Sequence, residues 1–221
     1  EEARRVLEQA LETHDCVLHI AFSSGLSGSY QSARIAAMEL QEQHPDKQIV
    51  VVDSLAASLG QGLLVHIAVQ MRDAGQSFQQ TVDWCMENRL HVVHLFTVDD
   101  LFHLYRGGRV SKATAIVGSM LNMKPVLHVD DEGKLVAVGK MRGRKRALDD
   151  LVKRMGEQIG DYENKTFFIS HGDCLADAEY VRDQVKEKFG IPDCLINFVG
   201  PSIGAHSGPG TVALFFLGKQ R

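Results

Sequence analysis

A single histidine stands within a run of glycine and proline at residues 200–210, which read GPSIGAHSGPG. Four of these eleven residues are glycine and two are proline, a composition that predicts a loop of special backbone geometry rather than a helix or a strand. Apolar stretches at 194–199 and 211–217 predict a strand on each side. An imidazole can donate a proton, accept one or hydrogen-bond an anion, so we expect His206 to face a pocket. The alternative is a structural histidine.

A serine-rich motif, SSGLSGSY, occupies residues 23–30, where one predicted strand ends and a helix begins. The first turn of a helix has unpaired N–H groups and a positive dipole end, which suit a phosphate or a carboxylate. Four serines and two glycines exceed what one helix cap requires, so we expect anion binding here. Simple capping by one serine is the alternative. The motif is neither GxxxxGK[ST] nor GxGxxG, so no nucleotide-binding motif is present.

Residues 105–111 read YRGGRVS and contain a further candidate for contact with an anion. The adjacent glycines allow the guanidinium of Arg109 to turn toward a cleft, where it would pair with a carboxylate or phosphate. In the alternative interpretation, Gly107 and Gly108 only end a helix and Arg109 lies on a solvated face. The residues leave both interpretations open.

Two other chemistries find less support in the residue types. A triad of Ser27, His206 and Asp53 can be drawn, but the GxSxG nucleophile motif is absent, which disfavours a hydrolase. His91 and His94 do not stand in an HExxH frame, so we expect no metal site.

Composition and charge narrow the class of protein. The 221 residues carry a net charge of −4, which argues against binding of nucleic acid or of an acidic membrane surface. No apolar run approaches the roughly 20 residues that span a bilayer, so we expect no integral membrane protein. The four cysteines form no CxxC pair, which is typical of free thiols in a reducing cytoplasm. The chain starts without methionine inside a helical pattern, and we expect that a preceding segment is missing.

The first 90 residues alternate strand and helix patterns, which predicts a parallel sheet with helices on its faces. Predicted strands lie at 16–22 and 48–52, and predicted helices at 27–42, 59–74 and 77–88, the last capped by Ser77.

The remaining residues mix hairpins with βα units, which predicts a mixed sheet. Predicted strands lie at 92–98, 124–129, 134–140, 166–170, 194–199 and 211–217, and predicted helices at 100–105, 112–121, 146–159 and 175–189. Asp130–Gly133 is the predicted hairpin turn. The chain is therefore of the α/β class, with a predicted boundary near residue 90 and domains over residues 1–90 and 91–221.

Five segments together resemble the DegV family, the bacterial fatty-acid-binding proteins. They are SSGLSGSYQSA (23–33), VVDS (51–54), YRGGRVS (105–111), GSMLNMKPVL (118–127) and GPSIGAHSGPG (200–210), in family order. The resemblance implies two α/β domains, a parallel Rossmann-like N-terminal one and a mixed-sheet C-terminal one. It also implies that a long-chain fatty acid such as palmitate lies in an apolar tunnel between the two domains.

The resemblance also implies a binding site. In the family, hydroxyls of the first motif hold the carboxylate, so Ser27 is the expected contact, with Ser23, Ser24 and the backbone of Gly28 close by. His206 matches the histidine that closes the network, and Arg109 matches the arginine of the Gly-Gly-Arg motif.

Two features depart from the family pattern. A threonine-bearing segment nearer the N-terminus, which also holds the carboxylate in the family, has no counterpart in these residues. Ser29 stands where the family commonly has threonine, but it keeps a hydroxyl.

The function that the resemblance implies is that of a carrier. It would present the fatty acid to a separate, ATP-using fatty-acid kinase for phospholipid synthesis. We therefore expect a cytoplasmic binding protein that is not itself an enzyme and that uses no cofactor, metal or nucleic acid. Two alternatives stay open: an enzyme acting on a small phosphorylated or keto substrate, such as a sugar-phosphate isomerase or a small-ketone kinase, and a regulatory protein that senses lipid.

Overall fold

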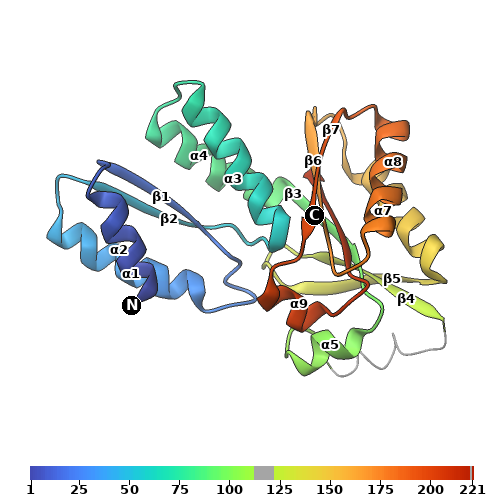
Figure 1. Cartoon of the computed structure of the whole chain (residues 1–221). Coiled ribbons are helices and arrows are strands. Elements are labelled where there is room, and N and C mark those ends of the chain that lie inside the picture. The colour runs from blue at the N-terminus through green and yellow to red at the C-terminus, as the bar shows by residue number, and fades with distance from the viewer. Residues whose placement is uncertain (112–121, 220) are drawn as a thin grey trace.

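The computed structural model describes residues 1–111, 122–219 and 221, so the helix predicted for 112–121 lies outside the described residues. Helices and strands alternate along most of the chain (Figure 1). The described elements are α1 (Glu2–Leu11), β1 (Cys16–Ala21), α2 (Ser29–Gln43), β2 (Gln48–Asp53), α3 (Ser58–Asp73), α4 (Phe78–Asn88), η1 (Arg89–His91), β3 (Val92–Thr97), α5 (Leu101–Arg106), β4 (Met123–Val129), β5 (Leu135–Arg142), α7 (Arg144–Gln158), β6 (Thr166–His171), α8 (Leu175–Phe189), β7 (Asp193–Phe198), α9 (Pro201–Ser207) and β8 (Val212–Leu217).

A small parallel sheet forms the N-terminal part, as predicted. β1 and β2 pair in parallel, from Cys16 opposite Gln48 to Ala21 opposite Asp53. Figure 1 shows α1 and α2 on one side of this sheet and α3 and α4 on the other. Ser77 caps α4 in a capping box with Gln80, which confirms the cap that the sequence predicts.

A six-stranded mixed sheet forms the rest, in the order β5-β4-β3-β8-β6-β7. Only β6 and β7 pair in parallel, and the other neighbours are antiparallel, so the mixed-sheet prediction is confirmed. The β4–β5 hairpin turns at Gly133, whose φ of +74° is easily reached only by glycine.

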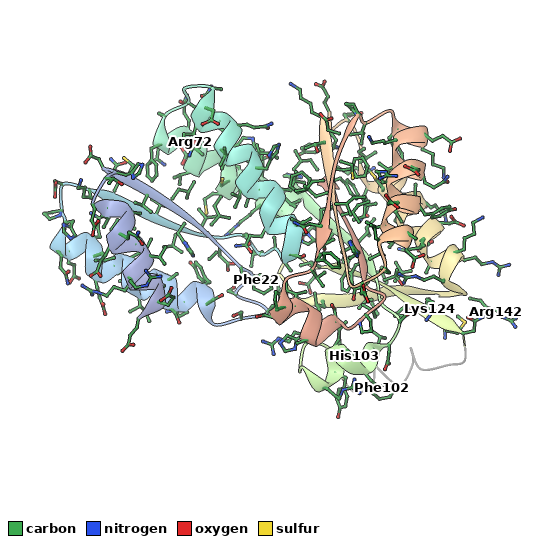
Figure 2. All side chains as sticks on the ribbon, in the orientation of Figure 1. Phe22, Arg72, Phe102, His103, Lys124 and Arg142 are labelled. Carbon is green, nitrogen blue, oxygen red and sulfur yellow. The ribbon has the colours of Figure 1, made fainter. Side chains whose placement is uncertain are left out.

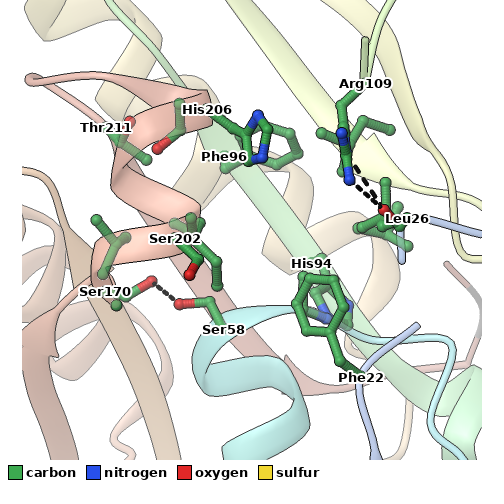
Figure 3. Close-up of a pocket in the computed structure, with 18 of the residues that line it drawn as sticks. Phe22, Leu26, Ser58, His94, Phe96, Arg109, Ser170, Ser202, His206 and Thr211 are labelled. Atoms are coloured by element: carbon green, nitrogen blue, oxygen red, sulfur yellow. Dashed lines mark hydrogen bonds between the residues drawn. The ribbon is translucent and has the colours of Figure 1, made fainter. Parts of the chain in front are cut away.

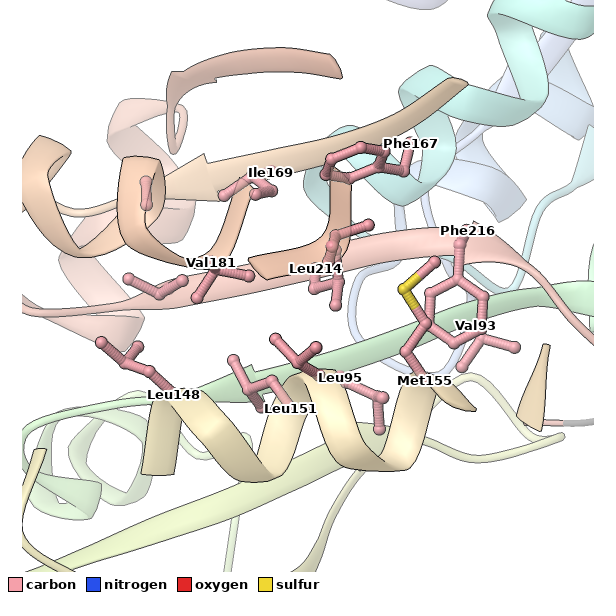
Figure 4. Close-up of a cluster of buried hydrophobic side chains, with 14 of the residues drawn as sticks. Val93, Leu95, Leu148, Leu151, Met155, Phe167, Ile169, Val181, Leu214 and Phe216 are labelled. Carbon is pink, nitrogen blue, oxygen red and sulfur yellow. The ribbon is translucent and has the colours of Figure 1, made fainter. Parts of the chain in front are cut away.

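The central strands β3, β6 and β8 are buried on both faces, so their alternate side chains serve two different cores. Odd-numbered residues of β3, such as Val93 and Leu95, pack against α7 and α8 in an apolar cluster (Figure 4). The opposite face of the sheet packs against α3 and α5 and also faces the pocket described below. The residues on this second face include His94 and Phe96 of β3, Phe168 and Ser170 of β6, and Ala213 and Phe215 of β8.

Helix α3 joins the two sheets. It contacts β1 of the small sheet and also β3, β6 and β8 of the large one. Both sheets therefore share one apolar cluster, which includes Ile20 and Val52 from the small sheet. The domain boundary near residue 90 stays a prediction.

The buried side chain of Arg221 stabilises the region where the two sheets meet. Its guanidinium donates hydrogen bonds to backbone carbonyls from three places: the β2–α3 loop, the segment from η1 to β3, and the β4–β5 turn. The acceptors are Ser54, Leu55, Arg89, Val92 and Asp130.

The prediction that residues 200–210 contain no helix is wrong, because Pro201–Ser207 form α9. Pro201 occupies the first turn, where its missing N–H costs no hydrogen bond and its fixed φ suits a helix. Gly208 ends the helix with a φ of +77°. The glycines and prolines thus mark the ends of a short helix. No helix among the described residues is long and apolar enough to cross a membrane.

Candidate functional site

The serine-rich loop, α9 and the start of α3 enclose a pocket of about 410 Å³ over the face of the large sheet (Figure 3). This volume lies in the range of small-molecule sites, roughly 300–1,000 Å³. Its walls are mostly apolar and include Phe96, Leu104 and Phe215. Figure 2 shows the labelled Phe22, another lining residue, between the N-terminal strands and α9.

Two serines of the SSGLSGSY motif line the pocket, Ser27 and Ser29. The turn that carries them is held by the backbone, since the Ser27 N–H donates to the Ser23 carbonyl at 3.1 Å. The Ser27 hydroxyl accepts from the Ser29 N–H at 3.2 Å. Helix α2 begins here and has no acidic side chain in its first turn, so its positive end is not neutralised locally.

Ser23 and Ser24 lie in the same motif, but neither lines this pocket. The buried Ser23 hydroxyl donates to the Gly133 carbonyl at 2.7 Å and thus ties the loop to the β4–β5 turn. The Ser24 N–H donates to a carboxylate oxygen of Asp53 at 3.1 Å. Gly28, the N-cap of α2, does not line it either. Contact of these three residues with a ligand stays a prediction.

Arg109 lies at the pocket, as in the first of the two interpretations of the YRGGRVS motif. Its Nε and Nη2 atoms donate to the Leu26 carbonyl at 3.2 and 2.8 Å, and Nη1 donates to the Gly107 carbonyl at 2.6 Å. A guanidinium has five N–H groups, so two of them have no acceptor among residues 1–111, 122–219 and 221. Arg109 therefore positions the serine-rich loop and also brings a positive charge to the pocket.

His206 reaches the pocket from α9 and lies half-buried. The ring packs against Gly107: a Cβ atom at residue 107 would lie only 2.0 Å from Nδ1 of His206. The glycine of the YRGGRVS motif is therefore needed for a close approach. Ser27, Arg109 and His206, which are distant in sequence, line one pocket.

His94 forms part of the pocket wall, a role that the sequence analysis did not foresee. Its Nε2 atom accepts from the Ala57 N–H at 3.2 Å, so the proton is on Nδ1, which donates to the Val92 carbonyl at 2.8 Å. Burial, and then the charge of Arg221, hold the pKa of His94 well below its usual 6.5. Unfolding restores the ordinary pKa, so stability falls as the pH drops below about 6.5, where only the unfolded histidine gains a proton.

Several hydroxyl groups of the pocket were also missed. Ser58, Ser170, Ser202 and Thr211 all line it. Ser202 and Thr211 flank His206 in or near the glycine-rich run, a signal that the sequence offered. Ser170 lies in the apolar strand β6, and no sequence signal separates it from an ordinary buried serine.

The chain belongs to the DegV family. The family model described as an uncharacterised protein of the DegV family matches residues 1–219. A DegV domain-containing protein of Clostridium perfringens is 46% identical over 205 residues, which are 93% of this chain and 70% of that protein.

Solved structures share the fold. A DegV family protein from Thermus thermophilus, described for its fatty acid binding, has a TM-score of 0.86 and 33% identity, with 98% of this chain and 76% of that chain covered. The Streptococcus pneumoniae Fatty Acid Kinase (Fak) B3 protein, loaded with linoleic acid, has a TM-score of 0.88. That match covers 97% of this chain and 75% of the other at 23% identity, and it shows the fold alone.

Proposed function

We propose that this protein binds a long-chain fatty acid, with the hydrocarbon tail in the pocket and the carboxylate near Ser27, Arg109 and His206. The observation that carries the proposal is the pocket itself, in which apolar walls meet a guanidinium, an imidazole and hydroxyl groups. Family membership supports it, because the Thermus thermophilus relative is described for its fatty acid binding.

The physical chemistry of a fatty acid fits this arrangement. Each CH₂ group that leaves water contributes roughly 0.8 kcal/mol, so a long tail favours apolar walls such as Phe96 and Phe215. An ionised carboxylate loses its hydration in such a pocket and needs several donors in return. Two N–H groups of Arg109 have no acceptor in the part of the chain that the structure describes, and these groups, with the imidazole of His206 and the hydroxyl of Ser27, can supply the donors.

The other predicted residues take supporting positions in this proposal. Ser23 and Ser24 hold the serine-rich loop in shape through their bonds to Gly133 and Asp53. Gly28 is the N-cap of α2, and we propose that its backbone meets the carboxylate at the positive end of that helix. The lipid then lies between the proposed domains, 1–90 and 91–221, since the pocket draws residues from both.

We further propose that the bound fatty acid is presented to a separate fatty-acid kinase in the cytoplasm, and that this chain catalyses no reaction and needs no cofactor. The shared fold with the Streptococcus pneumoniae Fatty Acid Kinase (Fak) B3 protein motivates the partner. A test is co-purification of a kinase from a bacterial lysate on the fatty-acid-loaded chain, compared with the delipidated chain.

Native mass spectrometry tests the binding proposal directly. The purified protein should carry an adduct of acyl-chain mass, and a double Ser27→Ala, His206→Ala variant should lose most of it while remaining folded. A matched control, Ser32→Ala with His44→Ala, removes an exposed serine and an exposed histidine of α2 and its C-cap, and should retain the adduct. An adduct of phosphosugar mass, or full retention of lipid by the folded Ser27/His206 variant, would count against the proposal.

A further inference from the structure

The pocket contains a second polar place, formed by Ser58 at the start of α3 and Ser170 in β6. Their Oγ atoms are joined by a hydrogen bond of 2.9 Å, and both residues line the pocket. Figure 3 shows this pair on a different side of the pocket from Arg109 and Leu26. A ligand whose carboxylate lies at Arg109 would therefore bring part of its tail past the serine pair.

The strand residues around Ser170 on this face of the sheet are apolar. Ser170 lies directly across the sheet from Ala213, which in turn lies across from Phe96. Two residues before Ser170, on the same face of β6, stands Phe168. Hydroxyl groups in such a wall do not help to bind a plain hydrocarbon tail. They lose their contact with water when the tail covers them, and a CH₂ group offers no hydrogen bond in return.

The hydroxyl hydrogens of the pair determine which hydrogen bonds it can offer to a ligand. Each serine hydroxyl has one hydrogen and two lone pairs. One of the two hydrogens lies between the oxygens, and the other has no acceptor among residues 1–111, 122–219 and 221. Ser170 is 0% exposed and Ser58 is half-buried, so a ligand meets Ser58 first. In the structure the Ser58 hydroxyl donates to Ser170, and because both hydroxyl hydrogens can rotate, the two serines can exchange roles when a ligand enters. Ser170 then donates to Ser58, and the hydrogen of Ser58 points into the pocket.

The charge around the pair favours a neutral ligand group. The ring of His94, in the same wall, has both nitrogens engaged, one with Val92 and one with Ala57. The guanidinium of Arg109 is held at the Leu26 carbonyl, on another side of the pocket. A carboxylate placed at the serine pair would thus lack a cation, whereas a hydroxyl or keto oxygen needs only the one donor.

We propose that Ser58, supported by Ser170, donates a hydrogen bond to a hydroxyl or keto oxygen on the acyl tail, so that the pocket selects oxygenated fatty acids. This inference rests on the proposed function, which places the carboxylate near Ser27, Arg109 and His206. The serine pair would then discriminate between oxygen positions along the acyl chain, because the pocket fixes the distance between the carboxylate site and the serine pair.

The backbone of Ser58 supplies a clean variant for the test. Ser58 holds a φ of +52°, in the left-handed region that favours glycine. Ser58→Gly therefore removes the hydroxyl without adding backbone strain. Ser170→Ala removes the supporting oxygen at the second position, so that the test does not depend on one variant alone.

The experiment measures the dissociation constants of stearic acid and of hydroxystearic acids that differ in hydroxyl position, with the delipidated protein. We expect at least one hydroxystearic acid to bind the wild-type protein more tightly than its isomers. In both variants its dissociation constant should rise roughly threefold to tenfold, the equivalent of one hydrogen bond, while that of stearic acid stays within twofold. Ser32→Ala, at an exposed position of α2, is the matched control.

The outcomes separate this inference from the proposed function. If stearic acid binds but no isomer is preferred, or the preference survives in both variants, the pair holds only water and the inference is wrong. Equal weakening of both ligands in both variants also overturns it, because the pair would then shape the pocket or hold the carboxylate. If the wild-type protein binds neither stearic nor hydroxystearic acid, the proposed function itself fails.

Discussion

Replacing Gly107 with alanine should displace His206 from the pocket while leaving the imidazole in the protein. The backbone at Gly107 has a φ of −76° and a ψ of −4°, which alanine adopts readily. The new Cβ, however, would lie 2.0 Å from Nδ1 of His206, and the three nearest atoms all belong to that ring. Real Cβ atoms essentially never come closer than 3.0 Å, so the ring must retreat by at least 1.0 Å, the difference between these distances.

The magnitude follows from the bond that is lost. A hydrogen bond to a charged group contributes about 1.5–3 kcal/mol. If the imidazole holds the carboxylate, a retreat of 1.0 Å breaks that bond, and fatty-acid affinity should fall roughly tenfold to 150-fold. Displacement of a fluorescent fatty acid from the delipidated protein measures this loss.

Two further variants make the test specific. Gly204→Ala places a Cβ on the same helix as His206, but its nearest contact is an ordinary 3.4 Å from Val199, so binding should stay within twofold. In the His206→Ala background, Gly107→Ala should have no additional effect, because the two changes act through one ring. A folded Gly107→Ala protein with wild-type affinity, or additive effects of the two substitutions, would refute the reasoning.

Three other outcomes are expected. Arg109→Lys keeps the charge but cannot bind the Leu26 carbonyl with two N–H groups, so fatty-acid affinity should fall about threefold to tenfold in the same displacement assay. His94→Gln should make unfolding free energy less dependent on pH below about 6.5, by up to roughly 1.4 kcal/mol per pH unit, in urea titrations at a series of pH values. Arg221→Met should lower the unfolding free energy by roughly 3 kcal/mol in urea titrations without ligand, because it leaves buried carbonyls without a donor.

Each of these outcomes has a control. The exposed Arg106, changed to lysine, should leave affinity unchanged; an equal loss would mean that the YRGGRVS segment acts as a whole. Burial also lowers the pKa of His19 and His128, so the wild-type slope has more than one source, and only the difference from His94→Gln tests His94. An identical slope in both proteins contradicts its assignment as a buried neutral group. Arg72→Met, at an exposed position, should not alter the free energy of unfolding. An Arg221→Met protein of wild-type stability would show that the hydrogen bonds of Arg221 contribute nothing to that free energy.

The fold was largely predictable because its patterns are local. Strand and helix periods in the first 90 residues predicted β1, β2 and the helices around them, and the parallel pairing followed from their alternation. The hairpin at Gly133 was predictable for the same reason, since a turn depends on the few residues within it. Helix α2 begins at Ser29 rather than at 27, a small shift that the Ser27–Ser29 contact explains.

The prediction for residues 200–210 failed because composition does not reveal position within an element. Glycine and proline disfavour the interior of a helix, yet Pro201 is suited to the first turn and Gly208 to the end. Only three residues between Gly204 and Gly208 complete the short α9, too few for a helical period to be visible in the sequence.

By itself, the sequence determined which side chains were available for an anion: the serines of residues 23–30, Arg109 and His206, each marked by an unusual local composition. Only the tertiary structure decided which of them share a pocket, since Ser27 and His206 line it whereas the Ser23 hydroxyl is bound to Gly133. It also decided that Ser170 and Ser58 meet. The physical reason is that sheet register and α3 packing set these distances, and such contacts join residues more than one hundred positions apart.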